Sequence, residues 1–376
     1  MNFYSYLLSS RAAQSRSFSK QLVNQAMLTA LIYFVVLFMG TNLYAFVDPN
    51  AYHWDGQQQF FEGWYFKASD PETGKSFLFI YAVLNPDGAS PDSCGFMMAG
   101  NNSPGYDGFI YQQFPVDTFS SSYEQFETRV SEENQAWGNL DDLHAQGSVT
   151  DGENTCSWSI DFEITERWDK TMGWMARLPN LQTYWHVGAM KSLATGWIEW
   201  NNERFEFEDI IGYQEKNWGD EFPDSWYWLQ ANNFDDPKAC CISVGAASMP
   251  IGSVVFPACG SGLIYDDRLY TFSFPQQPAL IRPEIEPGSW TITAVKGRHK
   301  IIIEASCDTA YLLNLVNPTE QGIKPWTWEA LNGQIRFQLY QKWGLRWFMI
   351  ADATSNLAGT EFGGEKWFGW DDGLLY

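Results

Sequence analysis

Hydrophobic and polar positions alternate over short runs along most of the chain, and turn residues separate these runs. From residue 50 onward, no stretch keeps the 3.6-residue period of a long amphipathic helix. A two-residue period is typical of β-strands, whose side chains point alternately to the two faces of a sheet. The pattern therefore predicts an all-β fold of short antiparallel strands, arranged as barrels or sandwiches.

Several pairs of apolar runs predict hairpins because each pair flanks a short turn. DPETG at 70–74 separates FFEGWYFKA from SFLFIYAVL, and Asn201-Asn202 separates TGWIEW from ERFEFED. Asparagine tolerates the positive φ that a tight hairpin turn demands. The C-terminal part repeats the pattern with LIY and LYTFSF around Asp266-Asp267-Arg268, SWTITAV and KIIIEAS around KGRH, and later QIRFQLY and LRWFMIAD.

The composition of residues 1–46 predicts a targeting leader rather than a part of the fold. They contain three basic residues and no acid, and the apolar run AMLTALIYFVVLFMG covers 26–40. One interpretation is a leader cleaved at a small-residue site near Ala45. The other is a retained membrane anchor, because the uncharged stretch approaches the roughly 20 residues that span a bilayer. Both predict a protein that works at a membrane.

The remainder divides into two β domains. The stretch NNFDDPKA predicts a boundary near residue 235, between an N-terminal domain at 47–235 and a C-terminal domain at 236–376, both of ordinary domain size. Between about 86 and 180 the sequence is rich in Gly, Asn and Asp and shows fewer clear strands. We expect long loops there, covering or edging a pocket.

Composition narrows the classes of function. The 376 residues are 45% hydrophobic and include 19 Trp, which supports a sizeable core. The net charge of −22 repels phosphate backbones and argues against a nucleic-acid partner. The six cysteines show no C-x-x-C spacing and the four histidines are scattered, so no metal site is predicted.

The run FFEGWYF at 60–66 places one carboxylate among five aromatics. In a strand, Glu62 and Trp64 share one face, while Tyr65 lies on the other. A carboxyl in apolar surroundings either keeps its proton or recruits a partner. Two interpretations therefore stay open for Glu62: a carboxylate paired with Arg or Lys, and a protonated acid in an apolar pocket.

A second candidate region spans residues 203–234. In its last strand the side chains of Trp226, Trp228, Gln230 and Asn232 share one face, an apolar wall with a polar end that suits a lipid with one hydrogen-bonding head. Alternatively, the tryptophans fill a core and the amides cap it. Just upstream, Glu215 and Lys216 either form a local ion pair or, if buried, become acid or base candidates.

The motifs in this order resemble those of the tocopherol cyclases. The matching stretches are YHWDG (52–56), FFEGWYF (60–66), WHVGAMKSLATGWIEW (185–200), ERFEFED (203–209), EKNWG (215–219), FPDSWYWLQAN (222–232) and EFGGEKWFG (361–369). Together they are specific, whereas any one alone is weak. The resemblance implies two lipocalin-like β-barrel halves, as in related carotenoid hydratases and cyclases, and no redox cofactor.

The implied reaction closes the phenol oxygen of a phytyl-benzoquinol onto the first prenyl double bond and forms a chromanol ring. Protonating that alkene gives a tertiary carbocation, so the site needs a dry acid and walls that stabilise a cation without supplying water. The catalytic candidates are Glu62, Glu215 and Lys216. The candidates for substrate binding are Trp64, Tyr65, His186, Asn217, Trp218, Trp226, Trp228, Gln230 and Asn232, with the indoles of Trp64, Trp218 and Trp228 as cation-facing walls.

Two residues depart from the pattern expected of the family. Leu84 stands where a Glu is expected before Asn-Pro, and His186 stands where Gln often follows the Trp of the middle motif. A different prenylquinol, or binding without turnover, would follow if either expected residue were catalytic.

The sequence thus predicts a membrane-associated tocopherol cyclase, in a plastid or a bacterial membrane, acting on a hydrophobic prenylquinol. A hydratase or cyclase of a polyprenyl or carotenoid substrate, and a non-catalytic lipocalin-like carrier, are the alternatives.

Overall fold

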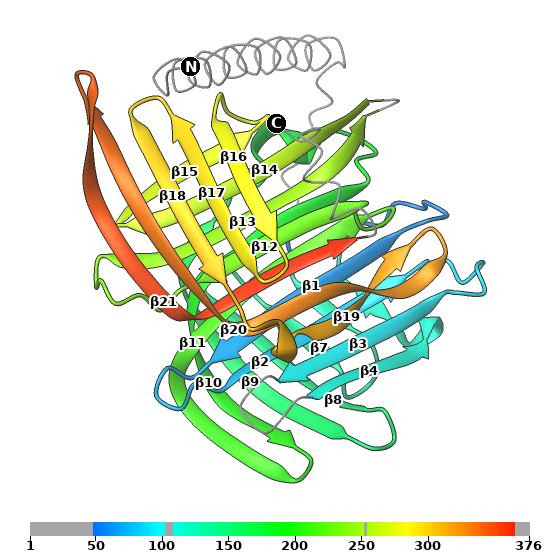
Figure 1. Cartoon of the computed structure of the whole chain (residues 1–376). Helices are drawn as coiled ribbons and strands as arrows, with labels where there is room; N and C mark the ends of the chain where they lie inside the picture. The colour runs from blue at the N-terminus through cyan, green and yellow to red at the C-terminus, as the bar shows by residue number, and fades with distance from the viewer. Residues whose placement is uncertain (1–47, 102–107, 252–253, 365–376) are drawn as a thin grey trace, which may run out of the picture.

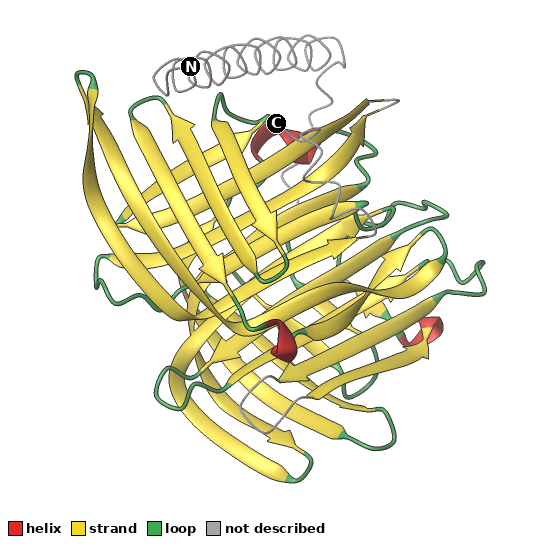
Figure 2. Cartoon of the chain, viewed as in Figure 1, coloured by secondary structure: helices red, strands yellow, loops and turns green. Residues whose placement is uncertain are grey.

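The computed structural model describes residues 48–101, 108–251 and 254–364, and strands make up most of them (Figure 2). Within these residues the only helical elements are three short 3-10 turns, Val116–Thr118, Gly173–Arg177 and Thr309–Tyr311. None of the helices in the described part of the chain has the length and apolar character needed to cross a bilayer. The predicted leader at 1–46 lies outside the described residues.

The first sheet has eleven antiparallel strands in the spatial order β4-β3-β2-β1-β11-β10-β9-β8-β7-β6-β5 (Figure 1). The sheet curls, so that β4 approaches β8, and Gln112 Oε1 accepts a 2.8 Å hydrogen bond from the main-chain N–H of Thr150. The strands are β1 (Phe61–Ser69), β2 (Ser76–Leu84), β3 (Cys94–Asn101), β4 (Gly108–Pro115), β5 (Ser120–Ser121), β6 (Glu127–Arg129), β7 (Gln135–Gly138), β8 (Asp142–Thr150), β9 (Thr155–Trp168), β10 (Thr183–Trp200) and β11 (Glu203–Gly219).

The second sheet has ten strands in the order β15-β14-β13-β12-β21-β20-β18-β17-β16, with β19 paired to β20. It also curls, since its edge strands β15 and β16 contact each other. The strands are β12 (Ser225–Ala231), β13 (Ala239–Ile251), β14 (Val254–Tyr265), β15 (Arg268–Phe274), β16 (Leu280–Glu286), β17 (Ser289–Lys296), β18 (His299–Ser306), β19 (Leu313–Thr319), β20 (Gly322–Trp343) and β21 (Arg346–Gly364).

The predicted all-β fold with two curled, lipocalin-like sheets is confirmed. The hairpin around 70–74 is β1–β2, with Ser69 opposite Ser76. The Asn201-Asn202 turn joins β10 to β11, and both asparagines adopt positive φ, 50° and 67°. The chain passes from the first sheet to the second between β11 and β12, whereas the predicted domain division near residue 235 stays a prediction.

The expectation of long loops between 86 and 180 is wrong, because β3 to β9 lie there. Most of these strands, β4, β8 and β9 among them, expose one face to water, so their sequences carry many polar residues. In β8, for example, Leu143, Ala145 and Val149 are buried while their neighbours are more exposed. Small apolar residues and glycine made this alternation hard to see in the sequence.

Three large apolar cores and one small cluster around Met175 hold the described part of the molecule together. One fills the first barrel and includes Trp64 and Phe66, and another fills the second barrel and includes Tyr227 and Leu229. The third lies between the sheets and contains Phe61 of β1, Trp228 of β12 and Leu331 of β20. Strands β1, β2, β3 and β12 are consequently buried on both faces, and they are the strands that read as almost continuous apolar runs.

Candidate active site

The two predicted acids lie on opposite faces of the β1–β11 strand pair. In this pair Glu62 is opposite Trp218, and Tyr65 is opposite Glu215. Directly opposed residues share a face, and neighbours along a strand point to opposite faces. Glu62, Trp64, Lys216 and Trp218 therefore point into the first barrel, whereas Tyr65 and Glu215 point toward the second sheet. The sequence candidates thus form two separate sites.

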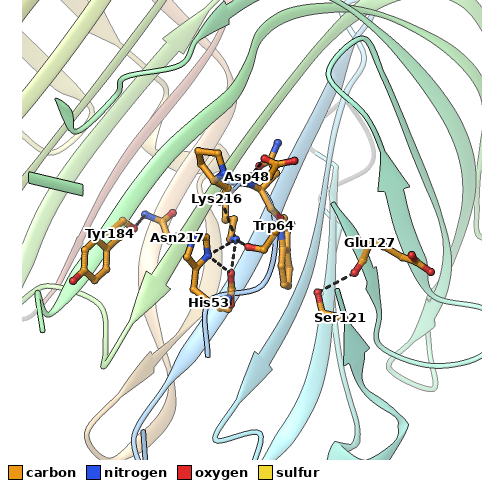
Figure 3. A network of polar contacts seen from close by, with 12 residues as sticks. Asp48, His53, Trp64, Ser121, Glu127, Tyr184, Lys216 and Asn217 are labelled. Atoms are coloured by element: carbon orange, nitrogen blue, oxygen red, sulfur yellow. Dashed lines mark hydrogen bonds and ion pairs between the residues drawn. The ribbon is translucent and has the colours of Figure 1, made fainter. Parts of the chain in front are cut away.

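Glu62 forms a buried ion pair inside the first barrel. Its side chain and that of Lys216 are fully buried, and Lys216 Nζ contacts Glu62 Oε1. Figure 3 shows Lys216 in this network, next to His53 and Trp64. His53 adds two contacts, from its main-chain N–H to Glu62 Oε2 at 2.9 Å and from its Nδ1 to Oε1 at 3.0 Å. Of the two interpretations of Glu62, the paired carboxylate describes this geometry.

The same lysine holds the segment at residues 48–53, which we call the N-terminal strap, across the interior of the barrel. Lys216 Nζ donates to the main-chain oxygens of Pro49, at 3.1 Å, and Ala51. Trp64 Nε1 donates to Asn50 O at 2.9 Å. Burial, opposed by the charge of Glu62, lowers the pKa of Lys216 to about 8. With its N–H donors satisfied by Pro49 O, Ala51 O and Glu62, Lys216 has the geometry of a structural cation.

The walls around this ion pair are aromatic. The ring of His53 stacks on Trp218 at 4.2 Å, and Tyr184 stacks on the same indole at 5.2 Å. Lys216 Nζ lies 4.9 Å from the ring centres of both Trp64 and Trp218. These two indoles, predicted to face a substrate cation, face the ammonium group of Lys216 instead, and their substrate-binding role stays a prediction.

Glu215 has a different environment, made of neutral hydrogen-bond donors. The indole N–H groups of Trp185 and Trp228 each donate to its Oε2 at 2.8 Å, and the Tyr213 hydroxyl donates to the same oxygen at 2.6 Å. Burial raises the pKa of Glu215 to about 7, although the three hydrogen bonds act in the opposite direction. This carboxyl can therefore hold a proton near neutral pH, and since Oε2 accepts three hydrogen bonds, the proton belongs on Oε1.

Glu215 lines a cavity of about 100 Å³ between the two sheets. The first sheet contributes Trp185 and Asn217, and the second contributes Trp226, Trp228 and Glu361. The remaining lining residues are mostly apolar and are Met172, Thr183, Phe222, Pro223, Tyr227, Gly245, Ala246, Ala247, Met249, Ala258, Cys259, Gly260 and Gln276. A buried carboxyl beside indoles in an apolar cavity has the character of an acid site.

Two glycines of β21 allow the indoles of β12 to lie against the neighbouring backbone. A Cβ at Gly359 would lie 2.5 Å from the Trp228 ring, and one at Gly363 would lie 2.0 Å from the Trp226 ring. Any larger residue would displace the indoles. The glycines thus fix the positions from which Trp228 reaches Glu215 and Trp226 reaches Glu361.

Two further acids that sequence reasoning missed complete this region. Glu361 lines the cavity and accepts a 2.5 Å hydrogen bond from Trp226 Nε1. Glu329 is opposite Glu361 in the β20–β21 pair and accepts a 2.6 Å hydrogen bond from Tyr65. Burial and neighbouring carboxyls raise the pKa of Glu329 to about 8, and that of Glu361 well above its ordinary value.

A signal for both acids existed in the sequence. Glu329 follows Trp326-Thr327-Trp328, an acid beside aromatics like Glu62. Glu361 opens the motif EFGGEKWFG, whose residues after 364 lie outside the described part of the chain. What no local pattern indicated is that β21 pairs with β12 and so brings Glu361 opposite Trp228.

The remaining predicted residues lie in several different places in the structure. Tyr65 and Asn217 lie with Glu215, and Asn217 Nδ2 also donates to Tyr184 O at 3.2 Å. His186 is buried, and burial together with the charge of Lys216 lowers its pKa to about 3, so the ring is neutral. Its predicted substrate contact stays a prediction.

The amides of Gln230 in β12 and of Asn232 just after it contact the first sheet rather than the cavity. Asn232 Nδ2 donates to Met190 O at 3.2 Å and to Gly212 O at 2.9 Å, and Gln230 Oε1 lies 3.5 Å from Lys67 Nζ. Their predicted role in binding a head group stays a prediction. Leu84, the departure in the second strand, is buried opposite Phe61 in the core between the sheets.

Comparisons with known proteins show the family of this chain and agree with its fold. The sequence profile of the tocopherol cyclase-like family matches residues 58–364. A probable chloroplastic tocopherol cyclase of Oryza sativa subsp. japonica is 30% identical over 85% of this chain and 79% of its own length. The chloroplastic tocopherol cyclase of Zea mays is also 30% identical, over 85% of this chain and 78% of its own length.

A solved structure shows the same fold at low sequence identity. It is a protein of Nitrosomonas europaea described as AttH, which is 13% identical, superposes with a TM-score of 0.51, and covers 86% of this chain and 98% of its own.

Proposed function

The chain belongs to the tocopherol cyclase-like family, and from this premise we propose that it closes the chromanol ring of a prenylated hydroquinone in the cavity between its two sheets. One observation carries the proposal. Glu215 is a buried carboxyl that lines the cavity, and its three hydrogen-bond donors are all neutral. The enzyme is an isomerase in this proposal, because substrate and product have the same composition and oxidation state.

The reaction begins when Glu215 transfers its Oε1 proton to the prenyl alkene carbon that leaves the more stable tertiary cation. The C=C π electrons form the new C–H bond, and the carboxylate left behind is stabilised by Trp185, Trp228 and Tyr213. The phenol oxygen then donates an electron pair to the cation and forms the C–O bond. Its proton returns to the Glu215 carboxylate, so the acid is regenerated without a co-reactant.

The cavity walls suit a short-lived carbocation. Indole faces stabilise cations by about 2 kcal/mol or more when they are desolvated, and Trp185, Trp226 and Trp228 all line the space. Apolar side chains such as Met249 exclude water that would hydrate the cation. The cavity of about 100 Å³ is smaller than the roughly 300–1,000 Å³ of sites that enclose a drug-sized ligand. It accommodates the reacting end, and the prenyl tail extends beyond it.

The protonation of Glu361 and Glu329 determines how much negative charge lies near Glu215. Because burial raises the pKa of both acids, they keep their protons to a higher pH than an ordinary glutamate and add less negative charge next to Glu215. A second carboxylate in the cavity would bind the cation as a fixed counter-ion and oppose loss of the Glu215 proton. Neutral companions therefore keep Glu215 available as the proton donor and later as the acceptor.

We also place the protein in a plastid, at a membrane. The two plant relatives are described as chloroplastic, and the residues 1–46 have the features of a transit leader or anchor. A prenylquinol partitions into lipid, so an enzyme that acts on it gains from working at the membrane surface.

The test is to incubate the purified full-length protein with a phytyl-benzoquinol and to identify the product. Chromanol formation that is lost in Glu215→Gln, in a variant that keeps the wild-type melting temperature, supports the proposal. A tertiary alcohol in place of chromanol would identify a hydratase, since water would then have captured the cation. Tight binding of the quinol without any product would identify a carrier. Either result would overturn the proposed cyclisation.

A further inference from the structure

The β20–β21 turn exposes a cluster of large apolar side chains. We call residues 341–349 the β20–β21 tip. Within it Trp343 is 65% exposed, Leu345 93%, Phe348 51% and Met349 53%. β18 pairs with β20 no further than Gln341, so among the described strands the tip has no neighbour on that side. Figure 1 shows this hairpin reaching beyond the other strands of its sheet.

The tip also gathers positive charge on an acidic protein. The stretches 296–300 and 340–350 contain no acid, in a chain whose net charge is −22. The main-chain N–H of Lys342 donates to Arg298 O at 2.7 Å, which places the β17–β18 turn beside the tip. Four basic residues are therefore clustered there: Arg298, Lys300, Lys342 and Arg346. Lys296, in the same turn, donates instead to Thr271 and Gln277.

Contacts with aromatic rings orient part of this charge. Lys300 Nζ lies 4.0 Å from the ring centre of Tyr340, and Lys342 Nζ lies 5.6 Å from that of Trp347. The nearest acids lie just beyond the tip and have basic partners: Asp352 is paired with Arg336 at 2.7 Å, and Asp266 with Lys238 at 3.3 Å beside Tyr265, which donates to Ile350 O. The tip is thus a compact group of exposed rings and cations.

We propose that the β20–β21 tip docks the protein onto an anionic lipid bilayer. Tryptophan is enriched at the boundary between lipid and water, and apolar side chains beside it enter the acyl region. Lys and Arg are attracted to an anionic surface, while a net charge of −22 repels the rest of the molecule. The attraction of one basic, apolar tip and the repulsion of an acidic body orient the protein with this hairpin toward the membrane. This inference goes beyond the proposed reaction and does not depend on it.

The β7–β8 turn provides a matched control within the same molecule. It also exposes apolar side chains, with Leu140 69% and Trp137 37% exposed, but Asp141 and Asp142 follow them directly. If exposure of apolar groups were sufficient, both turns would bind lipid. If positive charge is also required, only the β20–β21 tip binds.

Amide hydrogen exchange of the full-length protein, measured with and without vesicles, separates these two cases. The exchange rate is followed at the tip, so binding through the leader does not mimic the result. With vesicles of phosphatidylcholine and phosphatidylglycerol, we expect slower amide exchange in 341–349 and unchanged exchange in 137–142. Lys342→Gln combined with Arg346→Gln should raise the lipid concentration needed for half-protection by about thirtyfold. Leu345→Ser should also raise it, whereas Leu140→Ser should leave it unchanged. All four positions are exposed or half-buried, and circular dichroism verifies the fold of each variant.

Three results would overturn the proposal. The first is unchanged exchange in the tip when vesicles are added. The second is equal protection by pure phosphatidylcholine, because the anionic surface would then have no role. The third is protection that rises with protein concentration in the absence of lipid, which would identify a second copy of the chain as the occupant.

Discussion

Two glutamates of the β1–β11 strand pair are both buried, yet they have opposite chemistry. Glu62 faces the first barrel and pairs with the ammonium group of Lys216. Glu215 faces the second sheet, where two indoles and a phenol donate to it and where it lines a cavity. The comparison shows that burial alone does not make an acid catalyst. The charge of the partner decides whether a buried carboxyl stabilises the fold or can hold a proton.

The largest expected effect is on turnover at Glu215. Glu215→Gln keeps the shape and the donors of the site but removes the transferable proton, so kcat should fall by about 10²–10⁴-fold. The measurement is chromanol formation under saturating substrate. Glu361→Gln, a second buried acid in the same cavity, serves as the control and should cost less. Full activity of Glu215→Gln would remove this residue from the mechanism.

Next in size is the loss of stability at Glu62. Glu62→Gln leaves Lys216 buried without its counter-charge, which should lower the free energy of unfolding by about 3–5 kcal/mol. Denaturant titration measures the change. The double variant Glu62→Leu with Lys216→Met removes both charges and should regain part of the loss. A Glu62→Gln protein with normal stability and no turnover would contradict the comparison and make Glu62 the acid.

A smaller effect is expected from crowding the indole of Trp228. Gly359→Ala places a methyl group 2.5 Å from the Trp228 ring. This overpacking should lower the free energy of unfolding by about 1–3 kcal/mol. It should also lower kcat, because the displaced indole loses its hydrogen bond to Glu215. Gly63→Ala is the control, since a Cβ there meets Ala82 at an ordinary 3.5 Å. Equal behaviour of the two variants would show that the close approach of Trp228 has no role.

The smallest expected effect is the pH dependence of kcat and of stability. Because the pKa of Glu215 is raised to about 7, kcat should fall by roughly tenfold per pH unit above that value as the donor loses its proton. The free energy of unfolding should also fall as the pH rises. The folded protein keeps the Glu215 proton that an unfolded glutamate loses near 4.5, so the free energy of unfolding should decrease as pH rises from about 4.5 to about 7. A rate that increases over pH 7–8 would exclude Glu215 as the proton donor.

Much of the arrangement of the candidate site was predictable from the two-residue alternation of side chains along the strands. The two-residue period places Glu62 and Tyr65 on opposite faces of one strand, and the same rule separates Glu215 from Lys216. The shared face of Trp226 and Trp228 also follows from it, and both line the cavity. Turn residues such as Asn201 and Asn202 marked a hairpin correctly, because their positive φ is a local property.

Contacts between distant strands were not predictable in this way. That Lys216 reaches Glu62 depends on the pairing of β1 with β11. These strands are neighbours in the sheet but are separated along the chain by nine strands, β2 to β10, so no local pattern encodes the contact. The same holds for Glu361, which reaches the cavity because β12 pairs with β21, and for Glu329, which lies opposite it on β20. Strands between 86 and 180 such as β8 and β9 were missed because one solvated face makes them polar.

The N-terminal strap sets a limit on proteolytic maturation. The carbonyl groups of Pro49 and Ala51 bind the ammonium group of Lys216, and His53 binds Glu62. A processing cut upstream of residue 48 leaves all of these ligands in place, whereas a cut after Ala51 would release two of them and open the barrel interior around a buried cation. A peptidase that trims this protein must therefore stop before the strap begins.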